Sequence, residues 1–135
     1  MDKKEMLEFI RKHPVAFMAT TEGRAARVRG METYRADENG LIFYTDKHKQ
    51  VYKQLGENPD MEVCYFGRGM QVRVRGIIEE LEDDDLKRDI VTNRSFLQPM
   101  DEAGYANMAL FRLRGKATSW AIEDEGNPVS VFIDF

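Results

Sequence analysis

The stretch 41–55, LIFYTDKHKQVYKQL, changes character halfway, and the change predicts a strand that leads into a helix. Its first four residues are aliphatic, β-branched and aromatic, which is typical of a strand. Two polar residues interrupt this run, and the apolar residues after them recur at helical spacing. Lys47, His48 and Lys49 therefore fall at a strand-to-helix junction, where the free amides of the first helical turn favour negative charge.

Lys49 is the residue that this junction makes unusual. A lysine in the first helical turn opposes the helix dipole unless an anion lies nearby. Departures from local sequence rules are more common at functional sites than elsewhere. Two interpretations stay open: an ordinary exposed lysine, or a site for a phosphate group at the start of the helix.

The composition predicts one domain, 1–135, with a substantial hydrophobic core. Net charge is −4, yet residues 1–55 hold eleven Lys/Arg against eight Asp/Glu, and the rest holds nine against sixteen. This distribution favours a local anion site over a nucleic-acid partner. A single cysteine, a charged N-terminus and the lack of a long apolar run predict a cytoplasmic protein without a membrane partner. Two histidines and one cysteine predict no metal site.

The hydrophobic periodicity predicts a mainly β chain. Helices are expected at 3–12, 47–56 and 83–98, the last with Phe96 as a core residue. Strands are expected at 15–21, 25–35, 41–45, 61–66, 70–81, 108–120 and 129–135. Asn39-Gly40 is a strong hairpin signal, and short turns join most of the strands. We therefore expect an α+β, mainly β fold, in which six or seven strands form an antiparallel barrel with flanking helices.

Paired arginines recur on three of the predicted strands. Period two places Arg27 and Arg29 on one face of strand 25–35, with Val28 and Gly30 on the opposite face, toward the core. The same spacing recurs in MQVRVRG (70–76) and in LFRLRG (110–115). The arginines form either a solvated sheet surface or, in part, a phosphate site, because guanidinium groups bind pairs of oxygen atoms well.

Taken in order, these segments resemble the FMN-binding split β-barrel of the pyridoxamine 5′-phosphate oxidase family, and in particular its small general-stress-type members. The resemblance rests on FMATTEG, the Arg-Val-Arg strand, the Tyr-Thr strand end, the lysine after it, QLGENP, QVRVRG and GKATSW. It implies an antiparallel split β-barrel that binds FMN at the interface of a homodimer, with both subunits contributing to each site.

The resemblance also implies which residues bind the cofactor. The matching positions are Arg27, Val28, Arg29, Tyr44, Thr45, Lys49, Gln50 and Gln71. Among them, the second-strand arginines and Lys49 are expected at the phosphate, and Tyr44 and Thr45 are expected to line the flavin site. The resemblance assigns no catalytic side chain, because the flavin itself carries the redox chemistry.

The function implied by the resemblance is that of a homodimeric oxidoreductase or flavin reductase, which uses NAD(P)H and a small-molecule acceptor. The true oxidases carry a lysine for the substrate phosphate five residues after the second-strand arginine. Glu32 occupies that position here and would repel a phosphate, so pyridoxamine phosphate is not expected as a substrate. One alternative is a non-catalytic carrier of flavin, haem or deazaflavin. Another, a single-stranded nucleic-acid barrel, is disfavoured by the negative net charge.

Overall fold

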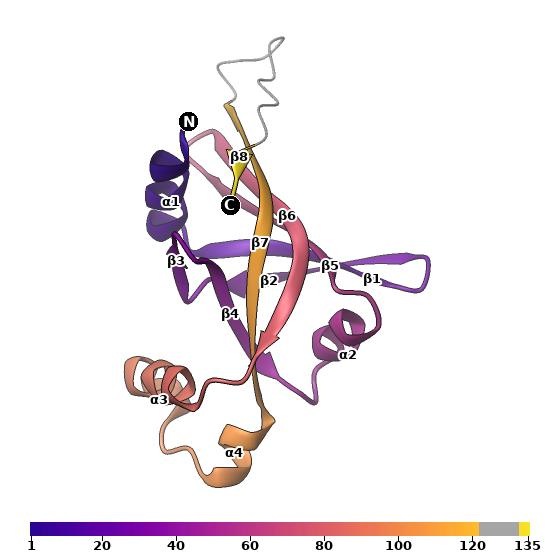
Figure 1. Cartoon of the computed structure of the whole chain (residues 1–135), viewed down its shortest axis with the longest axis vertical. Coiled ribbons are helices and arrows are strands. Elements are labelled where there is room, and N and C mark those ends of the chain that lie inside the picture. The colour runs from indigo at the N-terminus through magenta and orange to yellow at the C-terminus, as the bar shows by residue number, and fades with distance from the viewer. Residues whose placement is uncertain (122–132) are drawn as a thin grey trace.

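The computed structural model describes residues 1–121 and 133–135, which form a strongly bent antiparallel sheet with helices at its edges (Figure 1). The elements are α1 (Lys3–Lys12), β1 (Val15–Glu22), β2 (Ala25–Glu32), β3 (Arg35–Asp37), β4 (Gly40–Asp46), α2 (Gln50–Glu57), β5 (Asp60–Gly67), β6 (Met70–Leu81), α3 (Asp84–Asn93), the 3₁₀ turn η1 (Ser95–Leu97), α4 (Glu102–Asn107), β7 (Met108–Ala121) and β8 (Ile133–Asp134). The prediction of a mainly β antiparallel fold with flanking helices is confirmed.

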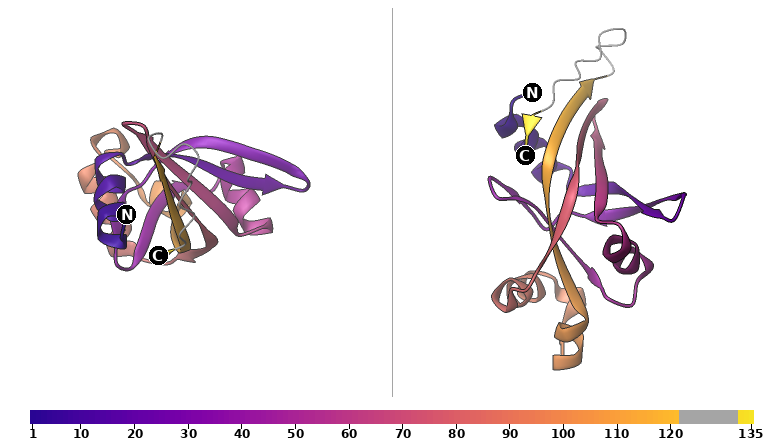
Figure 2. Two further views of the ribbon diagram at one scale, coloured as in Figure 1. Left: turned by 90° about the horizontal axis from the view of Figure 1, so that it is seen from above. Right: turned by 45° about the vertical axis from the view of Figure 1, so that its right-hand side comes forward.

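All of the strand pairs are antiparallel, in the order β2-β1-β5-β6-β7-β4-β3, with β8 paired to β7. The long pair β6 and β7 forms the spine of the sheet, and the β1–β2 hairpin projects from it (Figure 2). The described strands number eight, whereas at most seven were predicted. The difference arises because the predicted strand 25–35 is divided.

The division of this strand lies at Thr33 and Tyr34. The Thr33 amide donates to the carbonyl of Pro14 at 2.7 Å, beside β1. The next amide, of Tyr34, donates to the carbonyl of Ile42 on β4 at 2.8 Å. The chain thus changes its partner strand within two residues, which ends β2 and starts β3.

Two hydrophobic clusters stabilise the fold. The larger fills the interior of the bent sheet and includes the fully buried Phe43, Tyr65 and Val74. The smaller lies below it, where Ile90 of α3 packs against Leu110 of β7. The start of α1 is closed by a capping box between Asp2 and Glu5, which satisfies free amides of the first turn.

The predicted helices need two corrections. The helix expected at 47–56 begins three residues later, at Gln50, so that Lys49 is its N-cap residue. The helix expected at 83–98 ends at Asn93 and is followed by η1, and the predicted core residue Phe96 is 71% exposed. Of the strand predicted at 129–135, the structure places Ile133–Asp134 in β8, and 129–132 lie outside the described residues.

Val28 does not face the core. It is 69% exposed, on the outer face of the sheet, and Arg27 and Arg29 lie on the opposite face. In β6 and β7 the predicted apolar face does point to the core, since Val72 and Leu113 are fully buried.

Within the described residues, no helix has both the length and the apolar composition needed to cross a membrane.

Candidate functional site

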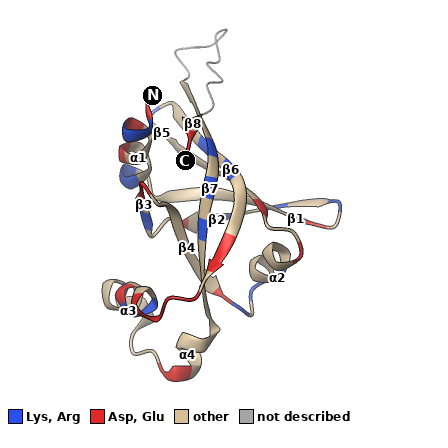
Figure 3. Ribbon diagram, viewed as in Figure 1, with Lys and Arg blue, Asp and Glu red and all other residues tan. Residues whose placement is uncertain are grey.

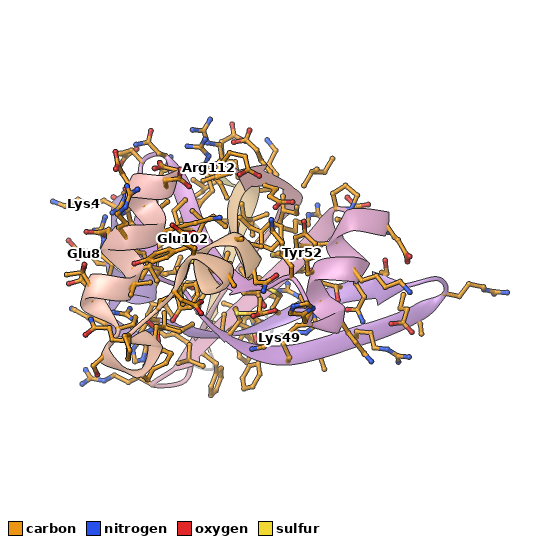
Figure 4. The ribbon with its side chains drawn as sticks, turned by 90° about the horizontal axis from the view of Figure 1, so that it is seen from below. Lys4, Glu8, Lys49, Tyr52, Glu102 and Arg112 are labelled. Carbon is orange, nitrogen blue, oxygen red and sulfur yellow. The ribbon has the colours of Figure 1, made fainter. Side chains whose placement is uncertain are left out.

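The strand-to-helix junction lies at the lower end of β4, where α2 begins. Asp46, the last residue of β4, accepts a hydrogen bond from the amide of His48 at 2.7 Å, so its carboxylate holds the turn. The N-cap residue of α2, Lys49, has an extended backbone and makes no side-chain capping bond. The positive end of this helix therefore carries a lysine in place of the usual capping oxygen. In the view from below, Lys49 lies at the start of α2 (Figure 4).

A pocket of about 320 Å³ lies beside this junction. It is bounded by the end of β2, the end of β4 and the segment that contains η1 and α4. Its lining residues are Gly30, Met31, Glu32, Tyr44, Thr45, Asp46, Lys49, Phe96, Leu97, Met100, Gly104 and Met108. Three of the predicted cofactor-binding residues, Tyr44, Thr45 and Lys49, are thus brought together in one pocket.

Thr45, a residue of this lining, carries a hydroxyl that the described part of the chain leaves unpaired. Its side chain is buried, at 8% exposure, and its Oγ1 has no hydrogen-bond partner among the described residues. A buried hydroxyl without a partner costs about 1–3 kcal/mol. Because Thr45 lines the pocket, its hydroxyl is a candidate hydrogen-bond partner for a ligand bound there.

Tyr44, the neighbouring residue, is neutral and half-buried in the same wall. Burial raises the pKa of its hydroxyl, and the nearby carboxylate of Glu32 raises it further. Tyr44 also makes an edge-to-face contact with Tyr34, with ring centroids 6.3 Å apart. At neutral pH the lining therefore includes a protonated phenol from Tyr44, while the side chain of Thr45, the next residue of β4, points to the opposite face of the strand.

Arg29 is occupied within the protein. Its guanidinium donates to Thr20 Oγ1 at 2.7 Å, to Gln54 Oε1 at 2.6 Å and to the carbonyl of Met18 at 3.3 Å. Burial lowers the pKa of this group. These bonds join β2, β1 and α2, so Arg29 holds α2 against the β1–β2 hairpin.

Arg27 is exposed and only weakly engaged. Its guanidinium lies 3.5 Å from Glu22 Oε1, at the upper limit for a hydrogen bond. The pKa of Glu22 is lowered first by a hydrogen bond from Gln54 and second by the charge of Arg27. Arg27 lies on the same face of β2 as Arg29 and can turn toward a ligand at small cost.

None of the other five predicted site residues lines this pocket: they are Arg27, Val28, Arg29, Gln50 and Gln71. Gln50 is exposed in the first position of α2. Val28 and Gln71 lie on the outer face of the sheet, where Gln71 is paired in register with Phe66 and Trp120. This face has its own shallow hollow of about 720 Å³ across β1, β5, β6 and β7, and basic residues lie along the last two strands (Figure 3).

Sequence reasoning missed one wall of the pocket. Phe96, Leu97 and Met100 line it, whereas the sequence pattern placed Phe96 and Leu97 in the helix expected at 83–98, with Phe96 in the core, and assigned Met100 to no element. The signal that could have found them is the apolar side chains of SFLQPM (95–100), which continue after α3 has ended. Among the residues that the structure covers, no group of three His, Cys, Asp or Glu could hold a metal ion.

Comparison with known proteins agrees with this architecture. The sequence model described as pyridoxamine 5′-phosphate oxidase matches residues 2–119. A NimC/NimA family protein from Clostridium acetobutylicum is similar in structure, with a TM-score of 0.79 and 22% identity, over 98% of this chain and 93% of that one. General Stress Protein 26 from Bacillus anthracis is also similar in structure, with a TM-score of 0.77 and 16% sequence identity, over 98% of both chains.

A third similar structure is an FAD-binding protein from Mesorhizobium loti, with a TM-score of 0.68 and 19% identity, over 88% of this chain and 94% of that one. At these identities the structural matches establish the fold, and the sequence match establishes the family. The chain belongs to the pyridoxamine 5′-phosphate oxidase family.

Proposed function

We propose that the protein is a homodimeric, cytoplasmic flavoprotein that binds FMN in the pocket between β2, β4 and α4. One observation carries the proposal: Thr45, whose buried hydroxyl has no partner among the described residues, lines the same pocket as Lys49, at a helix start without a side-chain cap. An anionic ligand with hydrogen-bonding atoms would satisfy both groups. The FAD-binding protein from Mesorhizobium loti, which has the same fold, supports a flavin as the class of ligand.

We expect different residues to bind different parts of FMN. Lys49 and the first amides of α2 neutralise the phosphate, and Arg27 adds a second positive charge from β2. Thr45 hydrogen-bonds the ligand, and Tyr44 contributes its protonated phenol. The apolar side chains of the opposite wall pack against a planar ring. When bound, FMN supplies the hydride and electron transfer, for which the protein provides position and access.

The homodimer is part of the proposal, because two of the residues expected at the flavin lie on the outer face. Val28 is 69% exposed there, and Phe17 and Phe66 on the neighbouring strands are 58% and 52% exposed. Large exposed apolar groups that cluster on one face are typical of an interface. A second copy that covers this face would bring Val28 and Gln71 to the partner's flavin.

The reaction we propose is the transfer of a hydride from NAD(P)H to a small-molecule acceptor by way of the flavin. Pyridoxamine phosphate is not the substrate, because Glu32 stands where a cation for its phosphate would be needed, and Arg94 already pairs with Glu32. The alternative is a protein on the same fold that stores flavin, or carries haem or a deazaflavin, without turnover.

The test is a visible spectrum of the purified protein with and without added FMN, followed by anaerobic titration with NADH and with NADPH. We expect flavin absorbance that shifts on binding, and bleaching by one of the nicotinamides. Binding without bleaching would favour the storage protein over the oxidoreductase. If excess FMN changes neither its absorbance nor its fluorescence in the presence of the protein, the proposal is wrong.

A further inference from the structure

Arg94 follows the last residue of α3 and reaches back to the end of β2. Its Nε donates to Glu32 Oε1 at 2.9 Å, and one of its terminal nitrogens donates to the same oxygen. The other terminal nitrogen donates to the carbonyl of Asn93 at 2.9 Å. All three guanidinium nitrogens are therefore engaged, and the ion pair joins a barrel strand to the start of the helical segment.

The aromatic ring of Tyr34 lies against this guanidinium. Its central carbon lies 5.0 Å from the centroid of the Tyr34 ring, a cation–π distance. Tyr34 in turn donates a hydrogen bond to Asp89 of α3 at 2.6 Å and contacts Tyr44 edge to face. Arg94 is thus connected to Tyr44 through Tyr34, and it also lowers the pKa of the Tyr44 hydroxyl directly, by its charge and by a side-chain hydrogen bond.

The residues directly after Arg94 form one wall of the pocket. We call residues 95–107 the helical wall; it contains η1 and α4 and contributes Phe96, Leu97, Met100 and Gly104 to the lining. Helices of three and six residues are not stable by themselves and depend on tertiary contacts. Leu97 and Met100 pack against the smaller cluster, and Gln98 donates to the carbonyl of Val91 at 2.7 Å, but Phe96, at the beginning of the wall, is 71% exposed.

We propose that the Glu32–Arg94 ion pair is a latch that fixes the helical wall over the pocket, which makes Arg94 a positioning residue for the ligand held there. The pair also neutralises Glu32, whose carboxylate would otherwise face an anionic ligand. Both side chains are partly buried, at 37% and 25% exposure, so the loss of either leaves the other poorly solvated. The identity of the ligand as FMN rests on the proposed function.

The first measurement is amide hydrogen exchange in the helical wall of the full chain, without FMN. We expect Arg94→Ala and Glu32→Ala each to raise exchange several-fold in 95–107, while exchange in β6 and β7 stays unchanged. Arg35→Ala is the control, because it removes a 3.3 Å ion pair with Asp89 of α3 and a 5.9 Å contact with the Tyr34 ring, but keeps the Glu32–Arg94 pair and touches no residue of the wall. That control should leave the exchange of 95–107 as it is.

The second measurement is the dissociation constant for FMN by fluorescence titration. We expect about a tenfold weakening in Arg94→Ala, no further weakening in the double variant Glu32→Ala/Arg94→Ala, and recovery in the charge-exchanged variant Glu32→Arg/Arg94→Glu. Arg35→Ala should bind as tightly as the wild type.

The two measurements separate the latch from the proposed function. Unchanged exchange in 95–107 after the loss of Arg94 would overturn the latch. Raised exchange with unchanged FMN affinity would overturn the positioning role. A wild-type protein that binds no FMN would overturn the proposed function, and the exchange data alone would then decide the latch.

Discussion

The hydroxyl of Thr45 is a buried polar atom that the described part of the chain leaves without a partner. Replacing it by the isosteric valine removes an unsatisfied group, so Thr45→Val should raise the free energy of unfolding of the ligand-free protein by about 1 kcal/mol. The same change removes a hydrogen bond to the ligand and should weaken FMN binding about tenfold. Urea denaturation and a fluorescence titration measure the two effects.

Thr20→Val is the matched control for this prediction. Thr20 is also buried, but its Oγ1 donates to Gln54 at 2.7 Å and accepts from Arg29 at 2.7 Å. Its loss leaves partners unpaired and should lower the free energy of unfolding by about 1–3 kcal/mol. If both valine variants were destabilised alike, Thr45 would have a partner after all.

Tyr65 is a buried phenol in the core, and it predicts how stability changes at alkaline pH. Burial raises its pKa, against a smaller lowering by its 2.5 Å hydrogen bond with Thr33. Because the pKa of Tyr65 is higher in the folded chain than in the unfolded one, its contribution to the free energy of unfolding is complete below the unfolded-state pKa, near 10. That contribution declines as the pH rises from there through the folded-state pKa.

Tyr65→Phe should therefore cost about 1–2 kcal/mol at pH 7, because it leaves the Thr33 hydroxyl unpaired, and this difference from the wild type should shrink above pH 10. Urea denaturation of both proteins from pH 7 to 11 provides the measurement. A difference that stays constant to pH 11 would show that the phenol ionises equally in the folded and unfolded chains.

The two arginines on one face of β2 differ in their contacts: Arg29 bonds to α2, and Arg27 does not. Arg29→Ala removes two hydrogen bonds to β1 and one to Gln54 of α2, and should lower the free energy of unfolding by about 2 kcal/mol. Arg27→Ala removes only an exposed contact to Glu22 and should leave stability unchanged, while it weakens FMN binding at least tenfold. Denaturation and titration of both variants decide this assignment, and equal stability losses would refute it.

The elements were predictable from the sequence where their patterning is local. The helix at 3–12 and the Asn39-Gly40 hairpin follow from capping, periodicity and turn chemistry, and the structure confirms both. The break at Thr33 could not be predicted, because it depends on which distant strand each amide meets. The orientation of Val28 was wrong because an exposed valine on a sheet face has the same alternation as a buried one.

The candidate site was predictable only in part. Tyr44, Thr45 and Lys49 are contiguous or nearly so in the sequence, and the structure brings them to one pocket. The role of Arg29 as a clamp depends on Gln54, a residue of a different element, and the ion pair of Arg94 crosses more than sixty positions of the chain. Contacts of this kind arise from the fold and leave no local signal.

The exposed apolar side chains on the outer face of the sheet lead us to expect a homodimer. Val28→Glu and Phe17→Glu place a charge on apolar side chains that we expect at the centre of the dimer interface. Each should convert a dimer into a monomer, as measured by light scattering, and weaken FMN binding. Lys4→Glu, on an exposed position of α1, is the control and should stay dimeric. A wild-type protein that is monomeric at micromolar concentration would contradict the expected assembly.

The central claim is that the pocket binds a flavin through its phosphate, at Lys49 and the start of α2. The most direct measurement compares the dissociation constants of FMN and riboflavin for the wild type and for Lys49→Ala. We predict that the wild type binds FMN at least tenfold more tightly than riboflavin and that Lys49→Ala largely abolishes this preference. Equal affinities of the wild type for the two flavins, or a preference that survives the loss of Lys49, would contradict the account.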